Sequence, residues 1–134
     1  MMAHSRYSRN VGAVYSLQYH IVFCPKYRRK VLVGEVEDAL KSLLLQKSQE
    51  LGLEIKAMEV MPDHVHLFVA ADPTDAPQRI VAQLKGFTAH ELRERFPYLK
   101  SRLPTLWSRS YFVASVGEVS AETITRYIEA QKGR

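Results

Sequence analysis

Two alternating segments joined by a tight turn place the strongest constraint on how this chain of 134 residues folds. Residues 53–61, LEIKAMEVM, and residues 64–70, HVHLFVA, both alternate in the way that half-buried β-strands do. Pro62 and Asp63 separate the two segments, and both residue types favour turns. The pattern therefore predicts an antiparallel β-hairpin, whose strands are neighbours in a sheet.

Two further segments predict the other strands of this sheet. Residues 13–24 alternate apolar and polar side chains with period two. Residues 111–116 form a shorter strand pattern, which Gly117 ends. Pro97 and Pro104 predict an irregular connection before that last strand.

Apolar residues at helical spacing predict two helices between the strands and one after them. The first helix spans residues 35–51, and Gly52 follows where a C-cap glycine is expected. The second begins in the segment DPTDAP, with Asp75 near its N-cap and a proline in its first turn, and runs to about Arg95. The last helix follows Ser120, which suits an N-cap.

The resulting order of elements, β-α-β-β-α-β plus a C-terminal helix, matches an α+β arrangement. It is the ferredoxin-like split βαβ topology, shared by RNA-recognition (RRM-like) domains, with helices on one face of an antiparallel sheet. No linker or repeat interrupts the pattern, so we expect one domain over residues 1–134. Val65, Leu67 and Val69 should then face the helices, which leaves His64 and His66 on the open face of the sheet.

Composition excludes several classes of protein. The chain is 46% hydrophobic and 25% charged, which indicates neither disorder nor a membrane protein. It lacks an 18-residue apolar stretch and the apolar core of a signal peptide, so we expect a cytoplasmic protein without a membrane partner. The single cysteine, Cys24, excludes an internal disulfide and is interpreted as a strand residue.

Positive charge gathers at the end of the first predicted strand. The formal net charge is +5, which favours polyanionic partners such as nucleic acid or anionic lipid. Four cations and one aromatic residue follow one another as Lys26, Tyr27, Arg28, Arg29 and Lys30. Such a mixture is expected where a nucleic-acid backbone and an unstacked base are held together, and its alternative is a solvated basic loop.

The histidine pair of the second hairpin strand is a candidate metal site. Two residues apart on one strand face, His64 and His66 have Cβ atoms roughly 7 Å apart, so both rings can converge on one ion. The alternative is two exposed strand histidines. Two ligands make a poor site, so a third must come from elsewhere. His20 belongs to the polar face of the first strand, which lies beside the third strand in this topology, and is a lateral candidate.

The surrounding sequence resembles one family of enzymes. The run MPDHVHLFV, residues 61–69, resembles the HUH motif, histidine-hydrophobic-histidine, of the single-tyrosine HUH transposases. These TnpA-type enzymes belong to the smallest bacterial and archaeal insertion sequences. The resemblance extends from YHIVFCPKYRRKVL, which begins at Tyr19, to YIEAQ near the C-terminus. The family carries a tyrosine on its last helix and a glutamine one turn later, as Tyr127 and Gln131 do here on one helical face.

This resemblance implies a reaction and the residues that perform it. Tyr127 attacks a phosphodiester of single-stranded DNA, leaving a 5′-phosphotyrosine bond and a free 3′-hydroxyl, and attack by that hydroxyl rejoins the strand. His64, His66 and Gln131 hold a divalent ion, Mg²⁺ or alternatively Mn²⁺, and no organic cofactor is needed. No residue is assigned as the base that deprotonates the phenol.

The resemblance also implies partners. Family members are homodimers that pair the histidines of one subunit with the tyrosine helix of the other, and they grip DNA hairpins at the transposon ends. Here the segment 26–30 and Lys85 of the second helix are the candidate DNA contacts, with Arg93 and Arg95 as secondary candidates. Relatives often carry two consecutive glycines before the tyrosine helix, where this chain has Gly117 and Glu118.

Three other functions compete with this interpretation. A non-catalytic RRM-like nucleic-acid-binding module would stack a base on Phe68, although the third strand carries histidines where stacking rings are expected. A zinc-binding or structural dimer would make Tyr127 dispensable. A relaxase or replication initiator of the HUH superfamily usually has a longer chain. The isolated Trp107 is interpreted as a packing residue rather than a base-stacking one.

Overall fold

The computed structural model describes residues 8–10, 13–15, 17–115 and 120–134 of the chain. Its centre is a four-stranded sheet in which every neighbouring pair of strands is antiparallel, in the order β4-β5-β3-β6. These strands are β3 (Leu17–Phe23), β4 (Glu54–Met61), β5 (His64–Ala71) and β6 (Phe112–Ser115). The first and third strands of the sheet are therefore neighbours, and the ferredoxin-like split βαβ prediction is confirmed.

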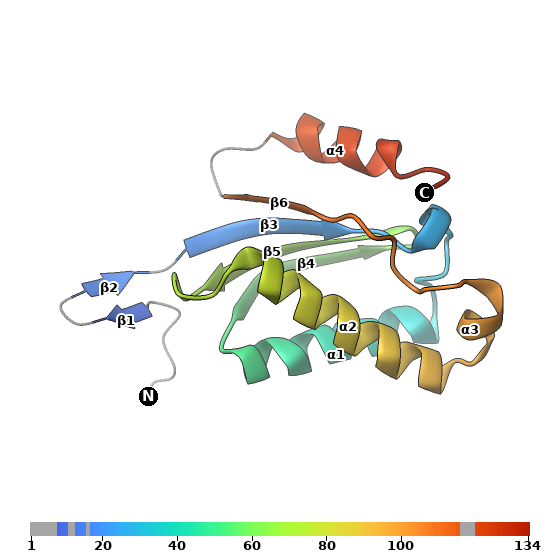
Figure 1. Cartoon of the computed structure of the whole chain (residues 1–134), viewed down its shortest axis with the longest axis horizontal. Coiled ribbons are helices and arrows are strands. Elements are labelled where there is room, and N and C mark those ends of the chain that lie inside the picture. Colours follow the sequence, from blue (N-terminus) through green and yellow to red (C-terminus); the bar gives the residue numbers. More distant parts are fainter. Residues whose placement is uncertain (1–7, 11–12, 16, 116–119) are drawn as a thin grey trace.

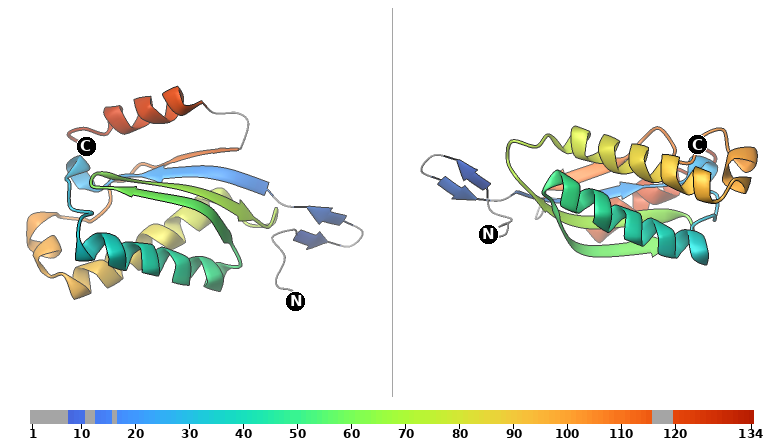
Figure 2. Two further views of the ribbon diagram at one scale, coloured as in Figure 1. Left: turned by 180° about the vertical axis from the view of Figure 1, so that it is seen from behind. Right: turned by 90° about the horizontal axis from the view of Figure 1, so that it is seen from below.

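The helices lie on both faces of this sheet (Figure 1). The long helices α1 (Glu35–Leu51) and α2 (Pro77–Arg95) pack side by side on one face. The C-terminal helix α4 (Ala121–Ala130) lies over the opposite face, with Ile124 buried beneath it. The sheet face predicted to be open is therefore covered by the helix that carries Tyr127 and Gln131 (Figures 1 and 2).

Strand alternation decides which side chains enter the main core. Val65, Leu67 and Val69 are completely buried under α1 and α2, as predicted, while His64 and His66 point to the α4 face and are partly exposed. The core between sheet and helices is built mostly from aliphatic residues of β3, β5, α1 and α2. Burying apolar surface stabilises a fold by about 25 cal/mol for each Å². This packing therefore holds the histidine strand in place.

Helix ends follow the predicted signals. Gly52 closes α1 in the left-handed conformation, at a φ of 75°, which glycine adopts without strain. Ser120 caps α4 by accepting a hydrogen bond from the Thr123 amide, as predicted. The N-cap of α2 is Ala76, so Asp75 lies next to the N-cap as predicted, and Pro77 supplies the preset φ of the first helical position.

Other predictions were wrong in detail. Residues 13–24 form two strands, β2 (Ala13–Tyr15) and β3, and Ser16 between them is outside the described residues. Strand β2 pairs with a further strand, β1 (Ser8–Asn10). The segment between Pro97 and Pro104 contains the short helix α3 (Tyr98–Arg102), and Cys24 lies just beyond β3. Val116, Gly117 and Glu118 also fall outside the described residues.

Two local irregularities were not predicted. Strand β4 shifts register against β5 between Ile55 and Ala57, so Lys56 is the extra residue of a bulge. The basic segment contains the 3₁₀ turn η1 (Lys26–Arg28). Across the described residues, no helix is both long and apolar enough to cross a lipid bilayer.

Candidate active site

Strand β5 presents His64 and His66 side by side on the face that α4 covers. The carboxylate of Asp63 accepts a hydrogen bond from His64 Nδ1 at 2.9 Å. Since a carboxylate only accepts, Nδ1 carries the hydrogen of this bond, and Nε2 is the ring nitrogen left to bind an ion. His66 Nε2 lies 3.0 Å from Nδ1 of His20 on the neighbouring strand β3.

The environment of His66 favours its neutral form. Burial lowers the pKa of His66 below its ordinary value, and the nearby His20 lowers it further. The neutral imidazole is the form that binds metal ions. His20 thus lies where the sequence placed it, in contact with His66 and stacked on Phe68 with ring centroids 5.3 Å apart. Whether His20 binds metal stays a prediction.

A pocket of about 350 Å³ opens in front of the two histidines. Its sheet wall is formed by Glu59, His64 and His66. Its helix wall is one face of α4, made by residues Ala121, Ile124, Thr125, Ile128 and Glu129. The pocket thus places imidazole and carboxylate groups directly opposite the C-terminal helix.

The two other predicted catalytic residues, Tyr127 and Gln131, are joined to each other through Ser110. The Ser110 hydroxyl lies 2.7 Å from the Tyr127 hydroxyl and donates to Gln131 Oε1 at 2.8 Å, and Gln131 is buried. The Tyr127 ring also packs against Phe112 of β6. Burial raises the pKa of Tyr127 above its ordinary value, and the Ser110 hydrogen bond offsets part of that rise.

The structure brings the predicted residues together as two pairs. Neither Tyr127 nor Gln131 is among the described residues that line the histidine pocket. Helix geometry explains the separation, because Ile128 faces the pocket and Tyr127 lies about 100° around the helix from it, toward β6. Within one chain, therefore, the nucleophile candidate points away from the histidine pair.

The loop that carries Ser110 is held by Lys85, a residue that the sequence predicted to contact DNA. The Lys85 ammonium of α2 donates to the backbone carbonyls of Ser108, Arg109 and Ser110 at 2.7, 3.4 and 3.2 Å. Burial lowers the pKa of Lys85 below its ordinary value. Lys85 thus anchors the loop that carries Ser110, and its predicted DNA contact remains a prediction.

The side chains of the basic segment have different surroundings. Tyr27 and Arg28 both have positive φ, at 60° and 52°, a region that non-glycine residues rarely occupy. Arg28 is mostly buried and forms an ion pair with Asp63. Tyr27 is exposed, with Lys26 and Arg29 near its ring.

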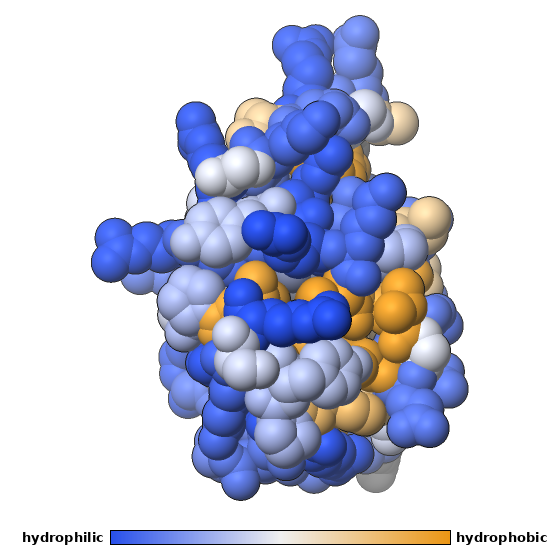
Figure 3. Space-filling view, turned by 90° about the vertical axis from the view of Figure 1, so that its right-hand side faces the viewer, coloured by the Kyte–Doolittle hydropathy of each residue, from blue (hydrophilic) through white to orange (hydrophobic). Residues whose placement is uncertain are grey.

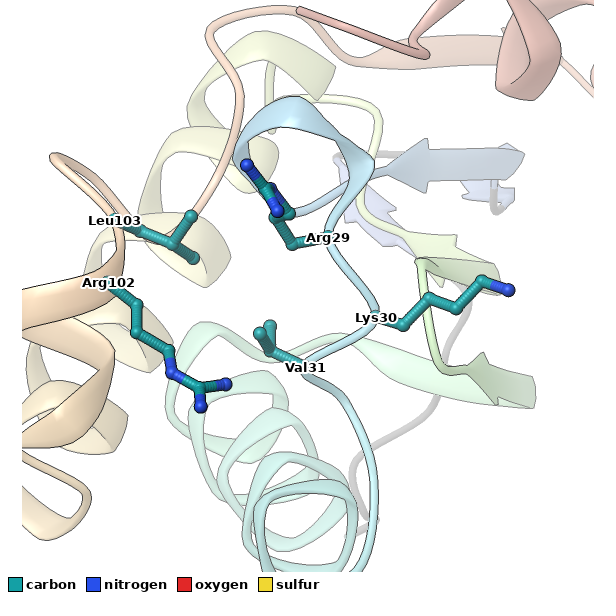
Figure 4. Close-up of a pocket in the computed structure, with 5 residues that line it drawn as sticks. All are labelled: Arg29, Lys30, Val31, Arg102 and Leu103. Carbon is teal, nitrogen blue, oxygen red and sulfur yellow. The ribbon is translucent and has the colours of Figure 1, made fainter.

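Arg29 and Lys30 line a second pocket, of about 390 Å³, together with Val31, Arg102 and Leu103 (Figure 4). Val31 and Leu103 give this pocket apolar surface, and the Lys30 side chain leads away from its centre. Figure 3 shows this end of the molecule, where hydrophilic side chains surround apolar residues. Segments far apart in the sequence thus place three cations around one hollow.

Trp107 packs in the core, as predicted. Its indole Nε1 donates to Thr88 Oγ1 at 3.0 Å, and its ring meets Phe23 edge-on with centroids 4.7 Å apart. The secondary DNA candidates are also engaged within the chain. Arg93 donates to the Leu103 carbonyl at 3.4 Å, and Arg95 pairs with Glu91 at 3.8 Å.

Besides Glu59 in the wall of the histidine pocket, sequence reasoning missed three residues of these two pockets and of the Tyr127 contacts. Ser110 and the carboxylate of Asp63 contact distant segments, and Arg102 lines the second pocket with residues 29–31. Asp63 had a local signal, since a carboxylate beside a candidate ligand histidine commonly orients it. The other two residues had none.

The donor set fits a divalent ion in part. His64 Nε2 and the neutral His66 ring offer two nitrogen ligands, and Glu59 adds a carboxylate at the pocket wall. Gln131 is turned toward Ser110 in this arrangement. Among the described residues, no group of three His, Cys, Asp or Glu side chains is close enough to hold an ion. A complete site therefore needs an oxygen donor from α4 or from a substrate.

Comparisons with known proteins identify the family of this chain. The family described as "Transposase IS200 like" matches residues 13–131. The chain is 46% identical to the ISDra2 transposase TnpA of Deinococcus radiodurans over 122 residues, which cover 90% of this chain and 87% of the relative. It is 33% identical to the transposase of insertion sequence element IS200 from Salmonella typhimurium, over 97% of this chain and 81% of the relative.

Solved structures extend the likeness to the fold. A Deinococcus radiodurans protein described as a transposase superposes with a TM-score of 0.87 at 41% identity, over 95% of this chain and 99% of that one. A REP-associated tyrosine transposase bound to a REP hairpin superposes with a TM-score of 0.57 at 15% identity, over 96% of this chain and 69% of that one. The second likeness concerns the fold alone. From its family match and its identity to these relatives, the chain belongs to the IS200-like transposases.

Proposed function

We propose that this transposase cleaves and rejoins single-stranded DNA at the ends of its insertion sequence, with Tyr127 as the nucleophile. The observation that carries the proposal is the placement of the tyrosine helix α4 directly over the sheet face that presents His64 and His66. A phenol and two imidazoles on facing elements suit attack on a phosphodiester.

The proposed step is a transesterification at phosphorus. The Tyr127 oxygen forms a bond to the phosphorus, the bond from phosphorus to the 3′ oxygen breaks, and the phenol proton leaves as the 3′ oxygen gains one. The product is a 5′-phosphotyrosine and a free 3′-hydroxyl, and attack by that hydroxyl reverses the step. Burial raises the pKa of Tyr127 above its ordinary value, so the phenol must lose its proton in the course of the attack.

We assign the metal site to His64, His66 and Gln131, with Mg²⁺ as the ion and Mn²⁺ as the alternative. When bound, the ion supplies Lewis-acid stabilisation of the charge that develops on the scissile phosphate. Asp63 orients His64 for this role, and Gln131 must leave Ser110 to contribute its amide oxygen. The need for that movement favours an active arrangement of α4 that differs from the one described.

We further propose a homodimer in which α4 of each subunit serves the histidines of the other. Tyr127 points to Ser110 of its own chain, and the described residues that line its own histidine pocket do not include it. A second copy of α4 that approaches from another direction would present its Tyr127 and Gln131 face instead. The cytoplasmic location expected from the sequence stays a prediction.

For the DNA partner we propose a hairpin gripped at the basic end of the molecule. Arg29, Lys30 and Arg102 line a hollow there together with the apolar Val31 and Leu103, which suits phosphates and a base of a folded strand (Figure 4). A protein of the same fold, the REP-associated tyrosine transposase, was solved bound to a REP hairpin. Two of the three remaining members of the basic segment, Lys26 and Tyr27, lie beside this hollow in the chain and are kept as contacts, whereas Arg28 pairs with Asp63.

A covalent adduct tests the nucleophile. Labelled single-stranded DNA from the ends of the element is incubated with the wild-type protein and with Tyr127→Phe, in Mg²⁺ and in chelator, and separated on a denaturing gel. We expect a protein–DNA adduct only with wild type and only with Mg²⁺. Tyr98→Phe, which removes an exposed phenol on α3, is the matched control and should still form the adduct.

The same gel distinguishes the proposed reaction from the competing function. Equal DNA binding by wild type and Tyr127→Phe, without an adduct from either, would contradict the proposal and favour a non-catalytic RRM-like binding module. An adduct formed by Tyr127→Phe would show that another residue is the nucleophile.

A further inference from the structure

Outside the proposed catalytic residues, the guanidinium of Arg28 links the turn before the histidine strand to the C-terminal helix. Its Nε lies 3.2 Å from Asp63 Oδ2. Its Nη1 donates to the Ile128 carbonyl of α4 at 3.2 Å and lies 3.6 Å from the Glu129 carboxylate. One side chain thus contacts two elements that the proposed reaction must align.

The contact with Asp63 extends to a proposed metal ligand. Asp63 holds Arg28 with one carboxylate oxygen and accepts from His64 Nδ1 with the other. The guanidinium therefore limits how the carboxylate can rotate, and the carboxylate in turn sets the orientation of the His64 ring. This is the usual chain of contacts by which residues behind a metal ligand control its geometry.

The surroundings of Arg28 favour this role over a direct contact with DNA phosphates. Its side chain is 16% exposed and that of Asp63 is 18% exposed, so both charges are largely removed from solvent. The backbone is also strained, because Tyr27 and Arg28 are consecutive non-glycine residues with positive φ. Such strain persists only where surrounding contacts hold it, and it commonly marks functional positions.

We propose that Arg28 is a positioning residue of the metal site, which orients His64 through Asp63 and couples that orientation to the last turn of α4. The metal part of this inference rests on the proposed function, whereas the effect on the His64 ring does not. A planar guanidinium with several donors can bridge a carboxylate and a carbonyl at once, which the point charge of a lysine does less well.

The test measures the His64 ring and metal affinity separately. NMR long-range ¹H–¹⁵N correlations report which ring nitrogen of His64 carries the hydrogen, and electron paramagnetic resonance of free Mn²⁺ gives the metal dissociation constant. The variants are Arg28→Gln, Arg28→Lys and Asp63→Ala, with thermal unfolding as a folding check. Arg126→Gln is the matched control, because it removes an exposed arginine of α4 that pairs only with Glu122 among the contacts shown by the described residues.

We expect wild type and Arg126→Gln to show the Nδ1–H form of His64. Asp63→Ala and Arg28→Gln should lose that single form and bind Mn²⁺ about 10- to 100-fold more weakly, the range found when residues behind a metal ligand are changed. Arg28→Lys, which keeps the charge, should fall between wild type and Arg28→Gln. This variant also keeps the test decisive if Arg28→Gln does not fold.

Two outcomes separate this inference from the proposed function. If His64 keeps its Nδ1–H form in folded Arg28 variants and their Mn²⁺ affinity equals that of wild type, the inference is overturned. A loss of hairpin affinity in those variants equal to that of Arg29→Gln would then make Arg28 a DNA contact. If wild type binds no Mn²⁺ but the His64 form still depends on Arg28, the metal proposal fails and the positioning role stands.

Discussion

Two of the cations predicted to meet DNA also contact groups of their own chain. The Lys85 ammonium contacts three carbonyls of the loop before β6, and the Arg28 guanidinium contacts the Ile128 carbonyl and Asp63. Carbonyls at loop and helix ends lack partners within regular structure, so a cationic side chain is an effective donor for them. At the residue scale, part of the positive charge counted from the sequence is therefore engaged within the chain.

The first residue-scale prediction concerns Lys85. Lys85→Met keeps most of the side-chain length and removes the donor to three carbonyls. Hydrogen bonds to charged groups are worth about 1.5–3 kcal/mol, and the Lys85 side chain is half-buried. We therefore expect the free energy of unfolding to fall by about 1–3 kcal/mol. Urea titration measures the change.

A matched variant separates this effect from a general loss of charge. Lys100→Met removes an exposed lysine that pairs with Glu94, and we expect it to cost less than about 0.5 kcal/mol. Equal stabilities of Lys85→Met and Lys100→Met would show that the loop before β6 does not depend on the Lys85 ammonium.

The second residue-scale prediction concerns Cys24. Burial, with the nearby Asp63 charge, raises the pKa of the Cys24 thiol to about 12, and the side chain is fully buried. We expect no alkylation by iodoacetamide at pH 8 in the native protein and complete alkylation in urea, as mass spectrometry would show. Rapid alkylation of the native protein would contradict the burial.

The raised pKa of Cys24 also predicts how the free energy of unfolding depends on pH. The unfolded thiol loses its proton near pH 9, whereas the folded thiol keeps it until about pH 12. The folded state therefore binds more protons in this window, and the Cys24 contribution to stability falls as pH rises from about 9 to 12. The difference between wild type and Cys24→Ala in urea titrations at pH 8 and pH 10 measures it.

At the element scale, α4 depends on contacts outside itself. A helix of ten residues is marginal on its own in water. It is held by the buried Ile124, by Ser110 through Tyr127 and Gln131, and by Arg28 at its last turn. Several of these contacts are single hydrogen bonds, each worth about 1 kcal/mol, so the movement of α4 that the proposed function requires would break only weak interactions.

The element-scale prediction tests how α4 begins. Ser120→Ala removes the N-cap bond to the Thr123 amide, which should cost the helix about 1 kcal/mol. We expect amide hydrogen exchange in the first turn of α4 to become about fivefold faster, as NMR would show. Ser120→Asp restores an acceptor beside the positive end of the helix dipole and should recover wild-type exchange.

At the scale of the whole molecule, the separation of the His64 and His66 pair from Tyr127 and Gln131 bears on the proposed homodimer. His64 and Tyr127 belong to one chain but face different surroundings in it. Because two-fold dimers repeat every contact, two copies would generate two equivalent composite sites.

Mixing two inactive variants tests this arrangement. If sites are shared, a dimer of Tyr127→Phe with His64→Ala has one site with an intact histidine pair and an intact tyrosine. Random exchange of subunits at equal amounts should then recover about a quarter of the wild-type adduct. If each subunit serves its own site, the mixture should stay as inactive as the separate variants.

Local patterns in the sequence determined the elements of this protein and the faces they bury. Period-two alternation placed Val65, Leu67 and Val69 in the core and His64 on the other face. Gly52 ends α1 and Ser120 begins α4, as expected. These features follow from residues within one or two turns of each other, so a single sequence carries them. The HUH motif added the catalytic candidates by resemblance to a family.

Tertiary structure alone decided which partners the long and polar side chains found. Lys85 meets a loop 23 to 25 residues away, Arg28 meets a carbonyl 100 residues away, and Ser110 joins Tyr127 to Gln131. No local pattern encodes such pairs, because they depend on how α2, α4 and the sheet pack after their apolar faces are buried. The same packing turned Tyr127 toward β6, since one residue along a helix rotates a side chain by about 100°.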